Sequence, residues 1–282
     1  MSESSHVTQA SARPATLTFC HALHTAAIPA MNQSPPRNGS TPTVLLVHGG
    51  FADGSVWAGV IAELQAAGIE AVALANPLRS LAADAAYVAG AAGEIDGPVL
   101  LAGHCYGGAV ITAAGTLASN AVGLIYVAAF ALDEGESSLD MTGRFSGSQL
   151  LPVLRPVTSV SATGDPAVEL YIDREAFAGV FAADLPGRVA AAAAAAQRPI
   201  TAAAFEEKAQ VAAWKTIPSW YVIAAADRMI PAAAQQFMAQ RAGAHAIEVR
   251  ASHAITLAQP AAVAEQIAAA SFATRKRSGQ PT

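Results

Sequence analysis

A short stretch flanked by glycines holds the residue best suited to nucleophilic chemistry. Gly103, Cys105 and Gly107 form the pattern glycine–x–nucleophile–x–glycine. An apolar run at 98–102 precedes it, and a run of small residues at 109–118 follows it. This strand–turn–helix arrangement is typical of a nucleophile elbow, in which a sharp turn lifts the nucleophile above a sheet. The sequence therefore predicts that Cys105 is a nucleophile, at a position where serine is the usual residue.

Two further polar residues lie where the partners of such a nucleophile are expected. Asp227 follows the apolar run 218–224, and His253 follows the apolar run 246–249. Because parallel strands place their carboxyl ends at one edge of a sheet, these residues can meet Cys105 there. His253 would take the thiol proton, and Asp227 would orient the imidazole and stabilise the imidazolium. The chain order nucleophile, acid, histidine is a known order for such triads.

An acyl group attacked by sulfur develops a negative oxygen, which needs hydrogen-bond donors already in place. The backbone N–H of Tyr106, directly after the nucleophile, is the first predicted oxyanion donor. The second is expected from the glycine-rich loop 48–54, where we prefer Gly50 and keep Phe51 as the alternative.

Other polar residues near these motifs have their own interpretations. Asp133 follows a predicted strand and competes with Asp227 for the role of triad acid, the other interpretation being a helix cap. His48 is expected to brace the oxyanion loop through hydrogen bonds, and His104 to shape the site from the opposite side of the turn. His245 precedes its strand, which predicts a surface residue at the wrong end of the sheet.

The elements that must position these residues follow from the hydrophobic pattern. Short apolar runs predict strands buried on both faces, and apolar residues at helical spacing predict helices. Their alternation predicts an α/β fold with a doubly wound, mostly parallel sheet. The predicted strands are 43–47, 69–74, 98–102, 122–130, 218–224 and 246–249, and the predicted helices are 55–67, 81–94, 109–118, 231–241 and 260–272.

The alternation breaks between about 133 and 204. Several short helical patterns occur there, without a clear strand, and prolines and glycines separate them. We predict a mainly helical cap insertion that covers the carboxyl edge of the sheet and shapes the pocket, followed by a helix at 205–214. The whole domain is predicted to span 41–273, with a flexible tail at 274–282.

Residues 1–40 are rich in Ser, Thr, Ala, Pro and Asn and lack a steady periodicity. A disordered tail, an extension upstream of a true start at Met31, and a weak cleaved secretion signal are the three interpretations. Cys20, His21 and His24 resemble a metal cluster in spacing, but a disordered tail provides no rigid ligand shell. No metal is therefore expected.

Composition argues against several classes of function. Charged residues make up 13% of the chain and the formal net charge is −5, without a basic patch, so no nucleic-acid partner is expected. No apolar run approaches the ~18–20 residues of a membrane span. The two cysteines form no disulfide framework, which fits a reducing cytoplasm. We expect a cytoplasmic monomer or homodimer that needs no cofactor, because no cofactor motif is present.

Together, these motifs resemble the α/β-hydrolase superfamily, specifically the small single-domain esterases near haloperoxidases, plant methylesterases and hydroxynitrile lyases. The matching motifs are Leu46 to Gly50 with Trp57, Gly103 to Gly108, Asp227 to Pro231, and Ser252 with His253. The resemblance covers about 43–272 and implies the α/β-hydrolase fold. The elbow departs from the pattern at the nucleophile, Cys105, and a fold that hosts many reactions does not identify the substrate.

Cysteine at the elbow favours some substrates over others. A thiolate is a stronger nucleophile than a hydroxyl and a better leaving group, so it suits thioesters, strained lactones and activated esters. The dienelactone hydrolases of the superfamily use cysteine there. We expect a hydrolase for a small ester, lactone or thioester that works through Cys105, His253 and Asp227 and an acyl-enzyme. The alternatives are an acyltransferase with the same triad, a non-catalytic small-molecule-binding descendant, and a cysteine introduced in place of serine.

Overall fold

The computed structural model describes residue 1, residues 41–160 and residues 164–275. The architecture given below belongs to the unit Asn38–Thr282. The predictions for 2–40, including the spacing of Cys20, His21 and His24, lie outside the described residues. So does most of the tail predicted at 274–282.

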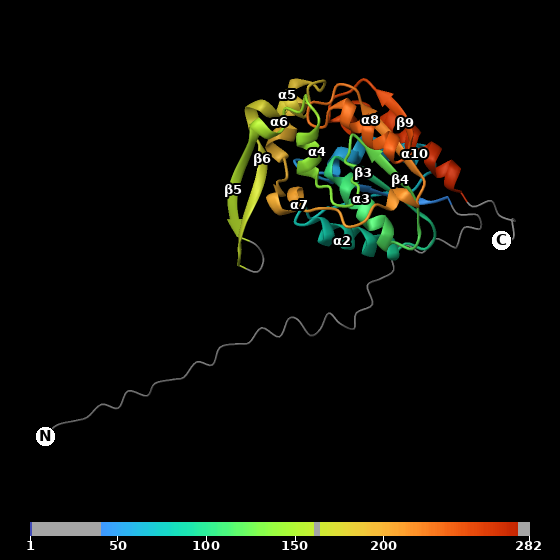
Figure 1. Ribbon diagram of the computed structural model, residues 1–282, viewed down its shortest axis with the longest axis horizontal. Coiled ribbons are helices and arrows are strands. Elements are labelled where there is room, and N and C mark those ends of the chain that lie inside the picture. Colours follow the sequence, from blue (N-terminus) through green and yellow to red (C-terminus); the bar gives the residue numbers. More distant parts are fainter. Residues whose placement is uncertain (2–40, 161–163, 276–282) are drawn as a thin grey trace. The chain divides into compact units, whose positions relative to one another are not determined.

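A six-stranded parallel sheet forms the centre of the molecule (Figure 1). Its strands are β1 (Thr43–Val47), β2 (Ala71–Leu74), β3 (Val99–His104), β4 (Ala121–Val127), β8 (Ser219–Ala224) and β9 (His245–Val249). Their order is β2-β1-β3-β4-β8-β9, and each neighbouring pair is parallel. Every residue of β3 and β8 is buried, as continuous apolar runs in a covered sheet require.

Helices cover both faces of this sheet. They are α1 (Ala58–Ala66), α2 (Leu81–Gly93), α3 (Tyr106–Leu117), α8 (Ala232–Arg241), α9 (Ile255–Ala258) and α10 (Pro260–Thr274). The chain runs outward from β1 to β2 and then back past β1 to β3, and right-handed crossovers therefore put α1 and α2 on opposite faces. The helix contacts agree, since α1 packs on α10 and α2 packs on α3. The predicted doubly wound fold is confirmed.

Local signals set the ends of most elements. Gly68, with φ 70°, follows α1, and the Ser80 hydroxyl caps α2 by accepting a hydrogen bond from Ala83 N–H at 3.2 Å. The strand predicted at 122–130 ends at Val127 instead. Its last residues leave the ladder because Ala128 adopts a φ of 43° and Phe130 N–H donates to the Cys105 carbonyl.

The insertion, residues 133–204, differs most from its prediction. It contains helices, as predicted, but also a small antiparallel sheet of order β5-β6-β7. The elements in and next to it are α4 (Ser138–Arg144), the 3₁₀ turn η2 (Leu151–Val153), β5 (Leu154–Val160), β6 (Pro166–Ile172), α5 (Arg174–Val180), α6 (Gly187–Ala196), β7 (Ile200–Thr201) and α7 (Ala202–Glu206). Figure 1 shows β5 and β6 as a long hairpin at one side of the molecule.

The hairpin was missed because β5 is mostly exposed and β6 mostly half-buried, so neither strand has the continuous apolar run of a buried strand. Pro156 looked like a break, yet β5 is an edge strand, where proline is tolerated. The helix predicted at 205–214 is also wrong, since α7 ends at Glu206. The residues that follow bond elsewhere: the Glu207 carboxylate accepts a hydrogen bond from Leu81 N–H at 2.6 Å, at the start of α2.

No helix in the described ranges is long and apolar enough to cross a membrane.

Candidate active site

Cys105 lies at the turn between β3 and α3. Its φ of 55° and ψ of −125° are angles that non-glycine residues rarely adopt. Such strain persists only where the surroundings determine it. Here the Cys105 carbonyl accepts hydrogen bonds from Gly108 N–H at 3.0 Å and Phe130 N–H at 3.1 Å. The turn therefore has the backbone geometry of a nucleophile elbow.

Glycines around the elbow are required by close backbone approach. A β-carbon on Gly107 would lie 2.2 Å from the Val47 carbonyl oxygen, and one on Gly103 would lie 2.4 Å from the Gly107 carbonyl group. A β-carbon on Gly49, in the loop after β1, would lie 2.5 Å from the β-carbon of Cys105. These contacts are shorter than any real β-carbon makes, so the sequence pattern around Cys105 reflects packing as well as chemistry.

His253 and Asp227 form a buried pair beside the elbow. His253 Nδ1 lies 2.7 Å from Asp227 Oδ2, and neither side chain is exposed. A carboxylate can only accept a hydrogen bond, so Nδ1 carries the proton. Nε2 is then the ring nitrogen available for proton transfer. In the described part of the chain, His253 Nε2 is buried without a hydrogen-bond partner. The loops after β8 and β9 thus bring together two residues 26 positions apart.

The electrostatics favour a positively charged His253. Burial lowers the pKa of His253, but its interactions with Asp227 and Cys105 outweigh burial and raise it to about 10. The influence of Cys105 is more electrostatic attraction than a well-formed hydrogen bond, since Nε2 lacks a partner of good geometry. An imidazolium next to sulfur is the arrangement that stabilises a thiolate.

Two of the other candidates lie away from this pair. Asp133 is bound by Lys215, whose Nζ lies 2.6 Å from Asp133 Oδ1, and its side chain is 31% exposed. The structure thus pairs the histidine with Asp227 rather than with Asp133. His245 is exposed at the start of β9, as predicted.

The predicted oxyanion donors can be separated by their hydrogen bonds. Phe51 N–H donates to the Arg198 carbonyl at 2.7 Å and is therefore occupied. Within the described residues, no hydrogen bond uses the N–H of Gly50 or of Tyr106. Both residues line the cavity at Cys105. The geometry therefore favours Gly50 over Phe51 as the second donor.

Two buried histidines brace the site. His48 Nε2 accepts from Asn76 N–H at 3.1 Å, and its Nδ1 donates to the Gly49 carbonyl at 2.9 Å. His104 Nε2 donates to the His253 carbonyl at 2.9 Å. Burial lowers the pKa of both, and with the nearby charge of His253 that of His104 falls to about 3. Both rings stay neutral, and His48 braces the oxyanion loop as predicted.

An apolar cavity adjoins Cys105. It is lined by Gly50, Phe51, Cys105, Tyr106, Phe130, Leu150, Ile200, Phe205, Met229 and Ile230. Its free space is about that of one water molecule. Leu150 and Ile200 belong to the insertion, and Phe205 follows it in α7. Among the described residues, no Asp, Glu, Lys, Arg or His side chain lines the cavity, so a neutral apolar group fits best, and a larger group requires the lining side chains to move.

Tyr106 is anchored by Asp84, a residue that the sequence analysis did not single out. The Tyr106 hydroxyl donates to Asp84 Oδ2 at 3.0 Å, and both Asp84 oxygens accept from Arg79 N–H at 3.2 Å. Asp84 is fully buried, which raises its pKa. The available signal was a carboxylate on the apolar stripe of α2, between Leu81 and Val88.

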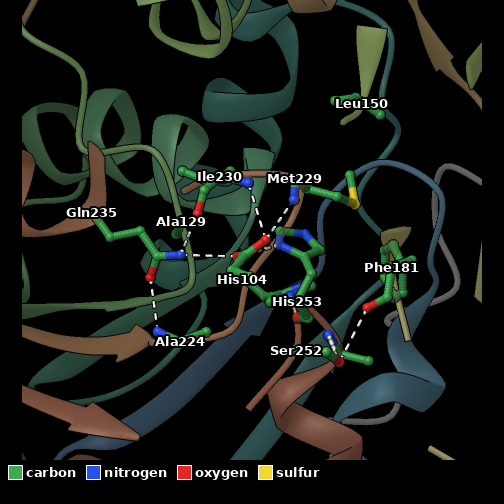
Figure 2. Close-up of polar contacts among 12 residues, drawn as sticks. His104, Ala129, Leu150, Phe181, Ala224, Met229, Ile230, Gln235, Ser252 and His253 are labelled. Atoms are coloured by element: carbon green, nitrogen blue, oxygen red, sulfur yellow. Dashed lines mark hydrogen bonds and ion pairs between the residues drawn. The ribbon is translucent and has the colours of Figure 1, made fainter. Parts of the chain in front are cut away.

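The insertion also contacts the loop that carries His253 (Figure 2). The Asp184 carboxylate accepts from Ser252 N–H at 2.7 Å and from the Ser252 hydroxyl at 2.5 Å. The Phe181 carbonyl accepts from Ala254 N–H at 2.9 Å, and the Phe181 ring packs 5.0 Å from that of His253. Nothing in the sequence links these distant segments, so these contacts could not be foreseen.

Gln235 is a third residue that was missed. It lies on α8 and is fully buried, although its neighbour Gln236 is exposed. Its amide bonds to Asp227 Oδ2 at 2.8 Å. The signal was an amide on the buried side of a helix, on the same face as Ala234 and Met238.

Among the described residues, no group of three or more His, Cys, Asp or Glu is placed to hold a metal.

Comparison with known proteins bears on this arrangement. A family model described as "Alpha/beta hydrolase family" matches residues 44–266. The match thus covers β1 to α10, including the elbow, Asp227 and His253. The comparison with curated proteins finds no match.

Three similar solved structures share the fold. A pyrethroid hydrolase from Sphingobium faniae is 22% identical, with a TM-score of 0.67 over 83% of this chain and 98% of its own. Polyneuridine aldehyde esterase is 18% identical, with a TM-score of 0.71 over 82% and 100%. A methylesterase from Arabidopsis is 17% identical, with a TM-score of 0.67 over 82% and 99%. At these identities the likeness shows the fold alone.

Proposed function

The chain belongs to the alpha/beta hydrolase family, and on this premise we propose that it hydrolyses a small ester, lactone or thioester with Cys105 as the nucleophile. His253 acts as the general base and acid, and Asp227 orients it. The observation that carries the proposal is the buried His253–Asp227 pair beside a cysteine in a strained elbow, with His253 Nε2 unpartnered among the described residues. Strongly perturbed titratable groups next to a cavity are typical of a catalytic site.

The first half of the reaction forms an acyl-enzyme. The Cys105 thiolate attacks the acyl carbon, a carbon–sulfur bond forms, and the carbonyl electron pair moves to oxygen. The N–H groups of Gly50 and Tyr106, which no hydrogen bond within the described ranges uses, stabilise that oxyanion. The intermediate collapses with loss of the alcohol or thiol, which takes a proton from His253 Nε2. A thioester on Cys105 remains.

Water completes the turnover. Neutral His253 takes a proton from a water molecule, which attacks the thioester carbonyl. The second tetrahedral intermediate expels the Cys105 thiolate, which reforms the ion pair with His253. The imidazolium is favoured in the free enzyme by Asp227 and Cys105, which raise the pKa of His253. The first half-reaction therefore begins from a state that the site already stabilises, and the second returns the enzyme to it.

The cavity and the sulfur together point to a class of substrate. Apart from Cys105, the described lining is apolar and uncharged, so the group next to the acyl carbon is small and neutral. Thiolate is a good leaving group, so the substrate needs an alcohol or thiol that leaves at least as easily. Two of the similar structures are named as a pyrethroid hydrolase and a methylesterase, and the second name is that of an ester-cleaving enzyme.

A panel of p-nitrophenyl esters, acyl thioesters and lactones tests the proposal. We expect turnover by the native protein, a mass increase equal to the acyl group, and loss of both in Cys105→Ala. Cys20→Ala is the matched control, because it removes the other cysteine and should retain both. Turnover by Cys105→Ala at the native rate would exclude Cys105 as the nucleophile. Faster product formation with added alcohols or amines would indicate acyl transfer instead of hydrolysis.

A further inference from the structure

Hydrogen bonds to both carboxylate oxygens hold the side chain of Asp227 in place. Asp227 Oδ1 accepts from Met229 N–H at 2.7 Å and from Ile230 N–H at 3.0 Å. Asp227 Oδ2 accepts from His253 Nδ1 at 2.7 Å and from Gln235 Nε2 at 2.8 Å. All four partners are donors, so the carboxylate is held as an anion with both oxygens occupied.

Gln235, on the buried side of α8, donates one of these hydrogen bonds. Figure 2 shows its side chain and its contacts as dashed lines. Its Nε2 donates both to Asp227 and to the Ile230 carbonyl, the latter at 2.7 Å. Its Oε1 accepts from Ala224 N–H at 2.9 Å, at the end of β8. Because Oε1 and Nε2 each have fixed partners, the amide cannot rotate without breaking several buried hydrogen bonds.

We propose that Gln235 is a positioning residue that aligns Asp227 Oδ2 with His253 and sustains the charge on that carboxylate. The backbone amides restrain only Oδ1, so without Gln235 the carboxylate can rotate about Oδ1 and its bond to His253 weakens. The imidazolium then loses part of its stabilisation. This inference rests on the proposed function, in which His253 cycles between its charged and neutral forms.

The competing explanation is that Gln235 only ties α8 to β8. A purely structural role would lower the melting temperature without changing the pKa of His253. The titratable groups around His253 are therefore part of the test: Asp227 from the loop after β8, and Cys105 and His104 from the elbow and β3. Tyr221 of β8 interacts with Asp227 and Cys105. Burial keeps His104 and Tyr221 neutral, so a shift would report on Asp227 or Cys105.

Two variants of Gln235 separate these explanations. Gln235→Met keeps the length but removes the donor, and we expect kcat to fall about ten- to a hundredfold, as for loss of one hydrogen bond to a charged group. The alkaline limb of the pH–rate profile should move to lower pH. In Gln235→Glu a protonated carboxyl still donates to Asp227, so its rate relative to the native protein should rise as the pH falls. Gln236→Met and Gln236→Glu are the controls, because the exposed Gln236 side chain donates to Glu248 and has no other hydrogen bond among the described residues.

A measurement independent of turnover completes the test. The proton shared by His253 Nδ1 and Asp227 Oδ2 gives a downfield NMR signal whose titration reports the pKa of His253. We expect that pKa to fall in Gln235→Met and to stay unchanged in the Gln236 variants. A native pKa and native pH–rate profile in folded Gln235→Met would overturn the inference. Because the NMR titration needs no substrate, it decides the role of Gln235 even if Cys105→Ala refutes the proposed nucleophile.

Discussion

The His104 ring donates a hydrogen bond to the backbone carbonyl of His253, at 2.9 Å, and the centroids of the two imidazole rings lie 4.7 Å apart. A residue of the elbow strand therefore holds the backbone of the proposed base directly. His104 precedes Cys105, so the same strand end carries the proposed nucleophile and braces the proposed base. The neutral state of His104 matters here, because a second charged ring would repel the imidazolium of His253.

Replacing His104 tests this bracing. His104→Ala removes a fully buried ring and its hydrogen bond, and we expect the unfolding free energy to fall by about 2–4 kcal/mol. Urea unfolding measures the change. The control is His245→Ala, whose exposed ring should cost under about 0.5 kcal/mol. An equal effect of the two substitutions would contradict the bracing role.

Stability in acid should reflect His104. Its pKa is about 3 when folded and 6.5 in the unfolded chain, so the unfolded state binds the extra proton between these values. The unfolding free energy should therefore rise as the pH increases from 3 to 6.5. Measured unfolding curves of His104→Phe should show a smaller rise across this range. The same slope in both proteins would mean that His104 titrates normally when folded.

Stability in alkali should reflect His253, with the opposite sign. Its folded pKa is about 10, above the unfolded 6.5, so the stabilisation is complete below pH 6.5 and is lost as the pH rises toward 10. We expect the unfolding free energy of the native protein to fall across this window more than that of His253→Gln. Thermal or urea unfolding at several pH values makes the comparison, and parallel curves would argue against the raised pKa.

The two candidate acids can be told apart by activity. Asp227→Asn keeps the shape but removes the charge that orients and stabilises His253, and we expect kcat to fall by about 10²–10⁴. Asp133→Asn should stay within twofold, because Asp133 contacts Lys215 at the surface. Ester turnover of the two variants provides the test. Loss of activity in Asp133→Asn alone would reverse the assignment.

The cavity should be open to enlargement. Phe205→Ala removes a buried ring from its lining, and we expect kcat/KM for longer acyl chains to rise about tenfold relative to acetyl esters. Phe272→Ala is the matched control, since that ring is 77% exposed on α10. A chain-length preference equal to that of the native protein would show that Phe205 does not bound the acyl site.

Much of the fold could be predicted because its signals are local. The strand 43–47 was predicted to the residue, since a continuous apolar run between loops has few alternatives. The elbow was equally clear, because Gly103 and Gly107 are required by contacts within a few residues or with the adjacent strand. The pairing of His253 with Asp227 could be proposed from the topology of a parallel sheet, before any distance was known.

What the sequence could not predict depends on contacts between distant segments. The hairpin of β5 and β6 has no buried face along most of its length, so it produces no apolar pattern. Gln235 and Asp84 are polar residues whose roles depend on what lies opposite them. Asp184 reaches Ser252 across 68 positions, and hydrophobic periodicity carries no information about such a pair.

The contacts of the insertion have a consequence for how this scaffold can diversify. The Arg198 carbonyl, in the insertion, accepts a hydrogen bond from Phe51 N–H in the loop after β1. The Ile200 side chain lies about 3 Å from where a β-carbon on Gly50 would be. The Asp184 carboxylate, from the same segment, accepts a hydrogen bond from Ser252 N–H, directly before His253. A chimera that exchanges residues 133–204 for another cap would therefore disturb the turnover rate along with the substrate preference. Selection for a new substrate would therefore act through a segment that also contacts the loops of the proposed oxyanion donor and base.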